Sequence, residues 1–291
     1  MTERGKVHGE REFRAATHDG ELVGWLRDGP ADVPPALLLH GGPGLNDYLQ
    51  SLADELDGLF PIARYQQRGV TPSTESGPRD VETHVEDVAA VLDALGWSRA
   101  VVVGHSWGGH LVMHFAVAHP ERLIGFVSID PLGAVGDGGL APFVEFLSSH
   151  VPDADRPRYE ELESRERLTD AEREESFRMV WPFYFADPAN APAFPGFRFD
   201  SDSSQTWLSI NHHLEAGILE SRLPEVDLPF LVIHGEKSPI PIANARLTAQ
   251  LVPNGRLAAL PGVGHWAWLE QPGSVRAEMA RFLDELPPNR S

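Results

Sequence analysis

The sequence predicts an α/β fold with a mostly parallel central sheet, helices on both faces and a helical cap insertion. Two observations support this prediction. Short apolar runs, each bounded by Gly, Pro or charged residues, alternate with helix-like stretches along the chain. The alternation stops between residues 136 and 217 and then resumes, which indicates a segment inserted into the sheet. At 291 residues the chain can bury a large core, and α/β folds of this length often form one domain.

The apolar runs have the length of buried strands. Residues 12–16 and 22–27 are predicted to open the sheet as a pair of strands. Residues 81–95 carry apolar side chains at helical spacing, and the Gly96 that follows them favours the end of a helix there. The other predicted strands span residues 36–39, 62–65, 100–103, 124–129, 230–233 and 256–260.

The segment 136–217 is rich in Pro, charged and aromatic residues, and two helices are predicted in it, at 158–163 and 170–180. We interpret it as a cap folded over one edge of the sheet. The chain then divides into a first part of the core (1–135), the cap insertion (136–217) and a second part of the core (218–291). Its aromatic residues are expected to form the core of the cap and in part to line a cleft: Trp181, Phe183, Tyr184, Phe185, Phe194, Phe197, Phe199 and Trp207.

Composition excludes several classes of function. The formal net charge of −19 would repel a phosphate backbone, which disfavours nucleic-acid binding. The chain has no Cys, so disulfides, thiolate catalysis and thiolate metal sites are excluded. Its start lacks the apolar run of a signal peptide, and no apolar stretch approaches the ~18 residues that span a membrane. We expect a cytoplasmic protein whose partner is a small molecule; the oligomeric state is not indicated.

The strongest motif is Gly-x-Ser-x-Gly at Gly104, Ser106 and Gly108, which follows a predicted buried strand and precedes a helix-forming run. A sharp turn from strand to helix strains the Ser backbone, and the flanking Gly residues avoid collisions with neighbouring backbone. The turn lifts the hydroxyl above the sheet and points the N-terminus of the helix towards it. The pattern predicts that Ser106 is a catalytic nucleophile.

An acyl-transfer nucleophile also needs donors for an oxyanion, usually two backbone N–H groups. Residues 40–44 (HGGPG) follow the strand predicted at 36–39. We expect the oxyanion hole, which also contacts the substrate, to be formed by the N–H groups of Gly42 in this loop and of Trp107 directly after the nucleophile.

A small loop after the last predicted strand presents a His. Residues 260–268 read LPGVGHWAW, which places His265 C-terminal to the nucleophile. The chain order nucleophile, acid, histidine is the one that this kind of strand–turn–helix nucleophile requires. His265 is therefore predicted to be the general base.

Four motifs together resemble the proline iminopeptidase-like branch of the α/β-hydrolase superfamily: HGGPG at 40–44, QRG at 67–69, GHSWGG at 104–109 and GVGHWAWLEQP at 262–272. The resemblance implies an α/β-hydrolase fold and a serine-dependent hydrolase of esters or amides that uses no cofactor. One position departs from the branch, whose turn reads DQRG, because Gln66 stands where the Asp would be. This departure weakens the implication of a true iminopeptidase.

The acid of the catalytic triad has more than one candidate. The resemblance implies an Asp after the strand at 230–233, but Ser238 stands at that position. Asp130 is the predicted acid, because it ends a strand expected beside the nucleophile strand and preserves the chain order. Glu236, or no carboxylate at all, are the alternatives. The choice matters, because loss of a triad acid can slow turnover by ~10⁴.

His110 and His114 share one face of the helix that follows Ser106, a spacing that can also bind metal. With no third ligand apparent, we interpret the pair as packing or a buried hydrogen bond and predict no metal site.

The motifs as a whole predict a serine hydrolase that cleaves an ester, lactone or amide of a moderately hydrophobic small molecule through an acyl-enzyme on Ser106. Two other classes of function stay open. One is an aminopeptidase similar to the proline iminopeptidases. The other is a protein that keeps the fold without hydrolysing, either a lyase or cyclase or a ligand-binding protein with a degenerate triad.

Overall fold

A computed structural model describes residues 9–165, 167–200 and 202–286, and these form an eight-stranded sheet in the order β1-β2-β4-β3-β5-β6-β7-β8. β2 runs antiparallel to both β1 and β4, and all other neighbours are parallel. The predicted fold class is confirmed. The strands are β1 (Glu10–Ala16), β2 (Glu21–Arg27), β3 (Ala36–Leu39), β4 (Ile62–Tyr65), β5 (Ala100–His105), β6 (Leu123–Ile129), β7 (Phe230–Gly235) and β8 (Gly255–Leu260).

The helices of the core follow the strand–helix alternation of the sequence. The helix predicted at 81–95 is observed with its N-terminus capped by Asp80, whose carboxylate accepts the N–H of Thr83 at 2.8 Å. The core helices are α1 (Gln50–Glu55), α2 (Val81–Ala94), α3 (Trp107–Ala118), α9 (Ile242–Leu251), α10 (Ala267–Glu270) and α11 (Ser274–Glu285), with short 3₁₀ turns at η1 (Pro120–Arg122) and η4 (Leu223–Glu225).

Alternate side chains of the central strands enter two different apolar clusters, because successive residues of a strand point to opposite faces. In β5, Val102 belongs to the cluster that includes residues of α2, α3 and α9. Its neighbours Val101 and Val103 belong to the cluster that includes residues of α1 and α11. The central strands are therefore covered on both faces, which explains why they appear in the sequence as continuous apolar runs.

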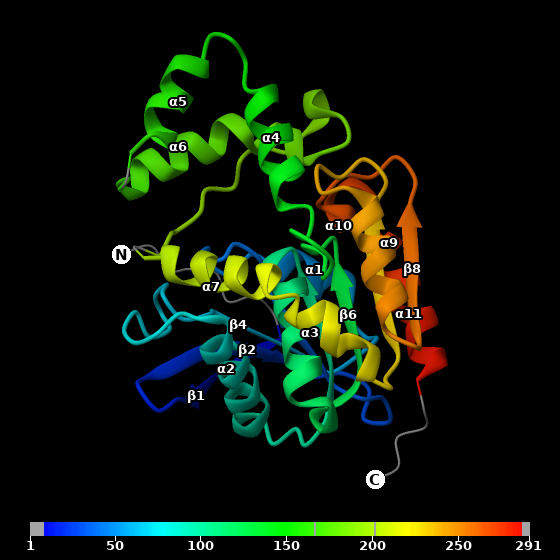
Figure 1. The fold of residues 1–291 in the computed structure, drawn as a ribbon. Coiled ribbons are helices and arrows are strands. Elements are labelled where there is room, and N and C mark those ends of the chain that lie inside the picture. Colours follow the sequence, from blue (N-terminus) through cyan, green and yellow to red (C-terminus); the bar gives the residue numbers. More distant parts are fainter. Residues whose placement is uncertain (1–8, 166, 201, 287–291) are drawn as a thin grey trace.

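The segment between β6 and β7, here called the insertion (residues 136–217), has two parts that lie against different regions of the core (Figure 1). Figure 1 shows α4–α6 over the end of the sheet to which the β6 and β8 arrows point, and α7 beneath them near α3. Leu214 of α7 lies in the same apolar cluster as residues of α3. Its elements are α4 (Leu140–His150), α5 (Arg156–Glu163), α6 (Asp170–Val180), η2 (Trp181–Tyr184), η3 (Pro188–Asn190) and α7 (Ser204–Glu215), followed by α8 (Ile218–Arg222).

The insertion is joined to the loop after β3. Leu45 and Phe199 form an isolated antiparallel bridge, and the N–H of Asp200 donates to the carbonyl of Gly44 at 2.7 Å. The carboxylate of Asp200 also lies 2.7 Å from Nε of Arg79, and both side chains are buried. These contacts hold the edge of the insertion beside the HGGPG loop, the predicted source of an oxyanion donor.

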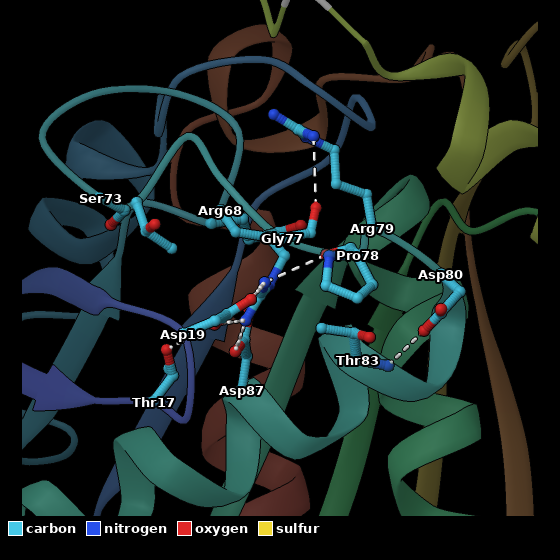
Figure 2. Close-up of polar contacts among 12 residues, drawn as sticks. Thr17, Asp19, Arg68, Ser73, Gly77, Pro78, Arg79, Asp80, Thr83 and Asp87 are labelled. Atoms are coloured by element: carbon cyan, nitrogen blue, oxygen red, sulfur yellow. Dashed lines mark hydrogen bonds and ion pairs between the residues drawn. The ribbon is translucent and has the colours of Figure 1, made fainter.

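Arg68 of the QRG motif anchors the turn that follows β4. Figure 2 shows its buried guanidinium between Asp19 and Asp87, with a further hydrogen bond to the carbonyl of Pro78. Nε and Nη2 of Arg68 each donate to Asp87 at 2.7 Å, a bidentate pair that joins the turn to α2.

Within the described parts of the chain, no helix has the length and apolar character needed to cross a membrane.

Candidate active site

Ser106 occupies the turn between β5 and α3, in the context that the motif predicts. Its φ of 56° and ψ of −121° are in a region that residues with a side chain seldom adopt. A Cβ on Gly104 would lie 2.0 Å from the carbonyl oxygen of Gly108, and one on Gly108 would lie 2.2 Å from that of Leu39. Only glycine fits at these two positions, and the turn that they permit places Ser106 as the N-cap of α3.

The HGGPG loop lies directly against this turn. A Cβ on Gly41 would be 2.8 Å from Cβ of Ser106, so the loop backbone approaches the Ser as closely as glycine allows. Gly42 has a φ of 137°, which also favours glycine. Gly42 and Trp107, the two predicted oxyanion donors, line the same cavity as Ser106 and His265.

The structure places Asp130 against His265. Asp130 directly follows β6, with a φ of 45°, and its Oδ1 accepts a hydrogen bond from Nδ1 of His265 at 2.7 Å. Both side chains are almost fully buried. Glu236 is exposed, and Asp130 occupies the Nδ1 side of the imidazole, so the geometry does not bring Glu236 into this pair.

Three further groups surround the carboxylate of Asp130. The hydroxyl of Ser238 donates to Oδ1 at 2.5 Å, the N–H of Gly235 donates to Oδ2 at 3.0 Å, and Nδ1 of His234 lies 2.8 Å from Oδ2. Burial acts to raise the pKa of Asp130, but His234 and His265 outweigh it and hold that pKa well below its ordinary value. The carboxylate is therefore ionised at neutral pH, which fixes a proton on Nδ1 of His265.

A hydrogen-bonded chain links the loop, the turn and the His265 segment. The N–H of Gly41 donates to the hydroxyl of Tyr48 at 2.7 Å, and that hydroxyl lies 2.7 Å from Nδ1 of His105. Nε2 of His105 lies 3.0 Å from the carbonyl of His265, which can only accept, so Nε2 carries the proton and Nδ1 accepts from Tyr48. Sequence reasoning missed Tyr48 and His105, although the position of His105 beside the nucleophile was a usable signal.

The two glutamines after β4 form hydrogen bonds with the HGGPG loop, with the residues that follow it and with Trp107. Gln67 donates from Nε2 to the carbonyl of His40 at 2.6 Å and accepts at Oε1 from the indole of Trp107 at 3.0 Å. Gln66 accepts from the N–H of Asp47 at 2.9 Å and donates to the carbonyl of Leu45 at 3.2 Å. An Asp in place of Gln66 would lack a donor for the second contact, which gives the departure from the family motif a structural role.

The cavity above Ser106 has a volume of about 240 Å³. Of the predicted aromatic residues of the insertion, Tyr184, Phe199 and Trp207 line it. Tyr184 also belongs to an apolar cluster, together with Trp181, Phe185 and Phe197. Among the described residues that line the cavity, none is Asp, Glu, Lys or Arg. They are Gly42, Pro43, Leu45, Tyr48, Ser106, Trp107, Leu132, Phe143, Phe177, Tyr184, Phe199, Trp207, Ile240, His265 and Trp266.

His110 and His114 form a buried hydrogen bond, with their Nε2 atoms 3.2 Å apart. Nδ1 of His110 lies 3.3 Å from the carbonyl of Leu132, and burial lowers the pKa of His110 to about 4. In the part of the chain that the structure describes, no group of three or more His, Cys, Asp or Glu side chains is arranged to hold a metal ion. The pair contributes to packing beneath the site.

The fold agrees with comparisons to known proteins. Residues 34–272, more than half of the chain, match the family model described as the alpha/beta hydrolase fold, so the chain belongs to the α/β-hydrolase family. It is 25% identical over 289 residues to the bifunctional esterase/perhydrolase DCH of Acinetobacter calcoaceticus, covering 92% of this chain and 98% of that protein.

The match to proline iminopeptidases is shorter. The chain is 31% identical over 126 residues to the proline iminopeptidase of Neisseria meningitidis serogroup A, which covers 40% of this chain and 41% of that protein. Among solved structures, VinJ superposes with a TM-score of 0.72 at 21% identity, over 95% of this chain and 99% of that one. The similarity to VinJ concerns the fold alone.

Proposed function

We propose that this protein is a serine-dependent hydrolase in which Ser106 is the nucleophile, His265 the general base and Asp130 the acid that orients the base. The observation that carries the proposal is the 2.7 Å hydrogen bond between Nδ1 of His265 and Oδ1 of Asp130, beside a cavity that Ser106 and His265 both line. With Nδ1 engaged, Nε2 of His265 is the nitrogen available to take a proton from Ser106.

The proposed reaction is acyl transfer in two balanced steps. The Ser106 oxygen attacks the carbonyl carbon, its proton passes to Nε2 of His265, and the carbonyl electrons move to the oxygen, which accepts hydrogen bonds from the N–H groups of Gly42 and Trp107. Collapse of this intermediate expels the leaving group, which takes the proton from His265. Water then repeats the sequence on the acyl-enzyme and releases the acid and free Ser106.

The substrate we propose is a neutral ester or lactone with an apolar or aromatic acyl group. The described lining of the cavity is mostly aromatic and aliphatic and carries no Asp, Glu, Lys or Arg. A charged substrate group would lose its hydration there without gaining an opposite charge. The insertion, which supplies Phe177, Tyr184 and Phe199 to the cavity, acts in this proposal as a cap that selects the substrate.

The partial match to a proline iminopeptidase supports an aminopeptidase of that branch as the second candidate. Such an enzyme must bind a free amino terminus, for which a carboxylate in the cavity would be the expected partner. The uncharged lining therefore favours the ester or lactone.

A fluorophosphonate probe and a series of p-nitrophenyl esters test the proposal on the purified protein. We expect stoichiometric labelling, turnover of a butyrate or hexanoate ester, and loss of both in Ser106→Ala with an unchanged circular dichroism spectrum. Faster cleavage of L-proline p-nitroanilide than of any ester would support the aminopeptidase. If the wild-type protein showed neither labelling nor turnover, the remaining candidate functions would be a non-hydrolytic enzyme and a ligand-binding protein.

A further inference from the structure

The carboxylate of Glu270 joins the loop that carries His265 to the insertion. Glu270 is the last residue of α10, and its Oε1 accepts a hydrogen bond from the N–H of Gly264 at 2.8 Å. Its Oε2 accepts from the N–H of Ala186, in the insertion, at 2.8 Å. One side chain therefore satisfies two backbone donors from segments that are far apart in the sequence.

The two segments also touch directly. The N–H of His265 donates to the carbonyl of Tyr184 at 2.8 Å. A Cβ on Gly264 would lie 2.6 Å from the carbonyl oxygen of Tyr184 and 2.8 Å from the backbone nitrogen of Ala186. The backbone of the insertion thus passes so close to the His265 loop that only glycine fits between them.

The opposite side of the His265 loop forms hydrogen bonds with the core. The N–H of Lys237 donates to the carbonyl of Val263 at 2.8 Å, and Nε2 of His105 lies 3.0 Å from the carbonyl of His265. Both backbone polar groups of His265 and its Nδ1 thus have partners, and the partner of its N–H belongs to the insertion. The position of the imidazole depends on the insertion being held in place.

We propose that Glu270 is a positioning residue for His265. Its two hydrogen bonds hold the His265 loop against residues 184–186 of the insertion and so keep the base aligned with Ser106. The inference rests on the proposed function, since it assigns His265 the role of base. A carboxylate suits this task, because its two oxygens accept from two converging N–H groups. Burial raises the pKa of Glu270 above its ordinary value, although the hydrogen bonds from Ala186 and Gly264 oppose that rise.

Two substitutions at Glu270 form a graded test. Glu270→Gln preserves the size of the side chain but replaces one accepting oxygen by an amide NH₂, whereas Glu270→Ala removes both acceptors. A small displacement of a catalytic group has a large cost in rate, so we expect kcat for a p-nitrophenyl ester to fall about 5-fold in the Gln variant and about 50-fold in the Ala variant. We expect KM to change by less than about twofold, because Glu270 does not line the cavity.

The matched control is Glu145→Gln, at an exposed glutamate of α4 in the same insertion, which should retain wild-type kcat and KM. A folded Glu270→Ala variant with wild-type kcat would overturn the proposal. So would an unchanged kcat with a raised KM, which would indicate a role in shaping the pocket alone.

Hydrogen exchange provides a readout that does not depend on turnover. In Glu270→Ala, amides of 184–186 and 262–266 should both exchange faster than in the wild type and in Glu145→Gln, because the Glu270 carboxylate accepts a hydrogen bond from each segment. Faster exchange in one segment only, or in neither, would show that Glu270 does not join them. A wild-type protein without esterase activity would contradict the proposed function, whereas the exchange result would still decide whether Glu270 fastens the loop.

Discussion

At the scale of single residues, the candidate site contains a carboxylate directly after β6 that accepts a hydrogen bond from a histidine in the loop after β8. Asp130 could be predicted as a candidate because it ends a strand beside the nucleophile strand. The sequence favoured Asp130 but did not exclude Glu236, because the outcome depends on which side chain reaches Nδ1 of His265 once β6 and β7 pair. Ser238, at the position where the resemblance implies an Asp, donates its hydroxyl to Asp130.

Asp130→Asn should lower kcat for ester hydrolysis by about 10³–10⁴ and leave KM within a few-fold. An amide has no negative charge to stabilise the imidazolium, and its NH₂ group can turn towards Nδ1 of His265 and favour the wrong tautomer. Steady-state kinetics of the two proteins, with thermal unfolding to confirm folding, provide the measurement. Glu236→Gln is the control and should retain wild-type kcat; a large loss there together with an active Asp130→Asn would assign the acid to Glu236.

Ser238→Ala should have a smaller effect, a decrease in kcat of about 3–10-fold. It removes one of the donors to Oδ1 of Asp130, and a hydrogen bond to a charged group contributes about 1.5–3 kcal/mol, part of which water or small movements can restore. Ser238→Thr keeps the hydroxyl and should recover most of the rate. Equal losses in the Ala and Thr variants would mean that the hydroxyl is not the group that matters.

At the scale of elements, apolar runs and turn residues predicted every strand of the sheet, with ends that differ by at most two residues. For the central strands the prediction succeeds because a parallel strand that is buried on both faces needs continuous apolar sequence, whatever its neighbours. The contacts that assemble the site were not predictable in the same way. Tyr48, Gln67 and Glu270 form hydrogen bonds between segments that are distant in the sequence. A polar residue in a loop is not part of a periodic sequence pattern, so its hydrogen-bond partner cannot be predicted from such a pattern.

The predicted division of the chain into two core parts and an insertion leads to a test by hydrogen exchange. Amides of α4–α6 should exchange faster than those of β5, because α5 is largely exposed whereas every residue of β5 is buried. The helices α7 and α8, which contribute Leu214 and Leu219 to a core apolar cluster, should exchange more slowly than α4–α6. Hydrogen exchange followed by mass spectrometry measures this directly. Equal protection of α5 and β5 would show that the insertion unfolds only with the core.

At the scale of the whole molecule, the interior of this acidic chain holds several histidines that are neutral when the protein is folded. Burial lowers the pKa of each of five: His40, His84, His105, His110 and His114. Each is uncharged in the folded protein at pH values at which the unfolded chain already binds a proton. Two of them lie beside the candidate site, since His105 directly precedes Ser106 and His40 begins the HGGPG loop, so the stability of the protein and the integrity of this site should respond to pH together.

The free energy of unfolding should therefore decrease as pH falls from about 6.5 to about 4. The sign follows from linkage: the pKa of a buried His is depressed on folding, so its contribution to stability is complete above the unfolded pKa and is lost as pH falls towards the folded one. Burial lowers the pKa of His84 to about 3, and its Nδ1 is without a hydrogen-bond partner among the described residues. Within this interval, each buried histidine of this kind adds up to about 1.4 kcal/mol per pH unit to the slope of the free energy of unfolding against pH.

His84→Gln isolates one of these contributions, because the substitution removes the titrating ring without adding a charge. Urea unfolding at half-unit steps between pH 7 and pH 4 should show a shallower loss of stability than in the wild type, even though the variant is less stable at pH 7 through lost packing against Trp107. His150→Gln, at an exposed position of α4, should leave the slope unchanged. If stability were flat across this interval, or if His84→Gln and His150→Gln had the same slope, the buried histidines would not be the source of the acid sensitivity. Below about pH 4 the curves should steepen again, since carboxylates whose pKa is lowered by folding, Asp130 among them, begin to lose their contribution there.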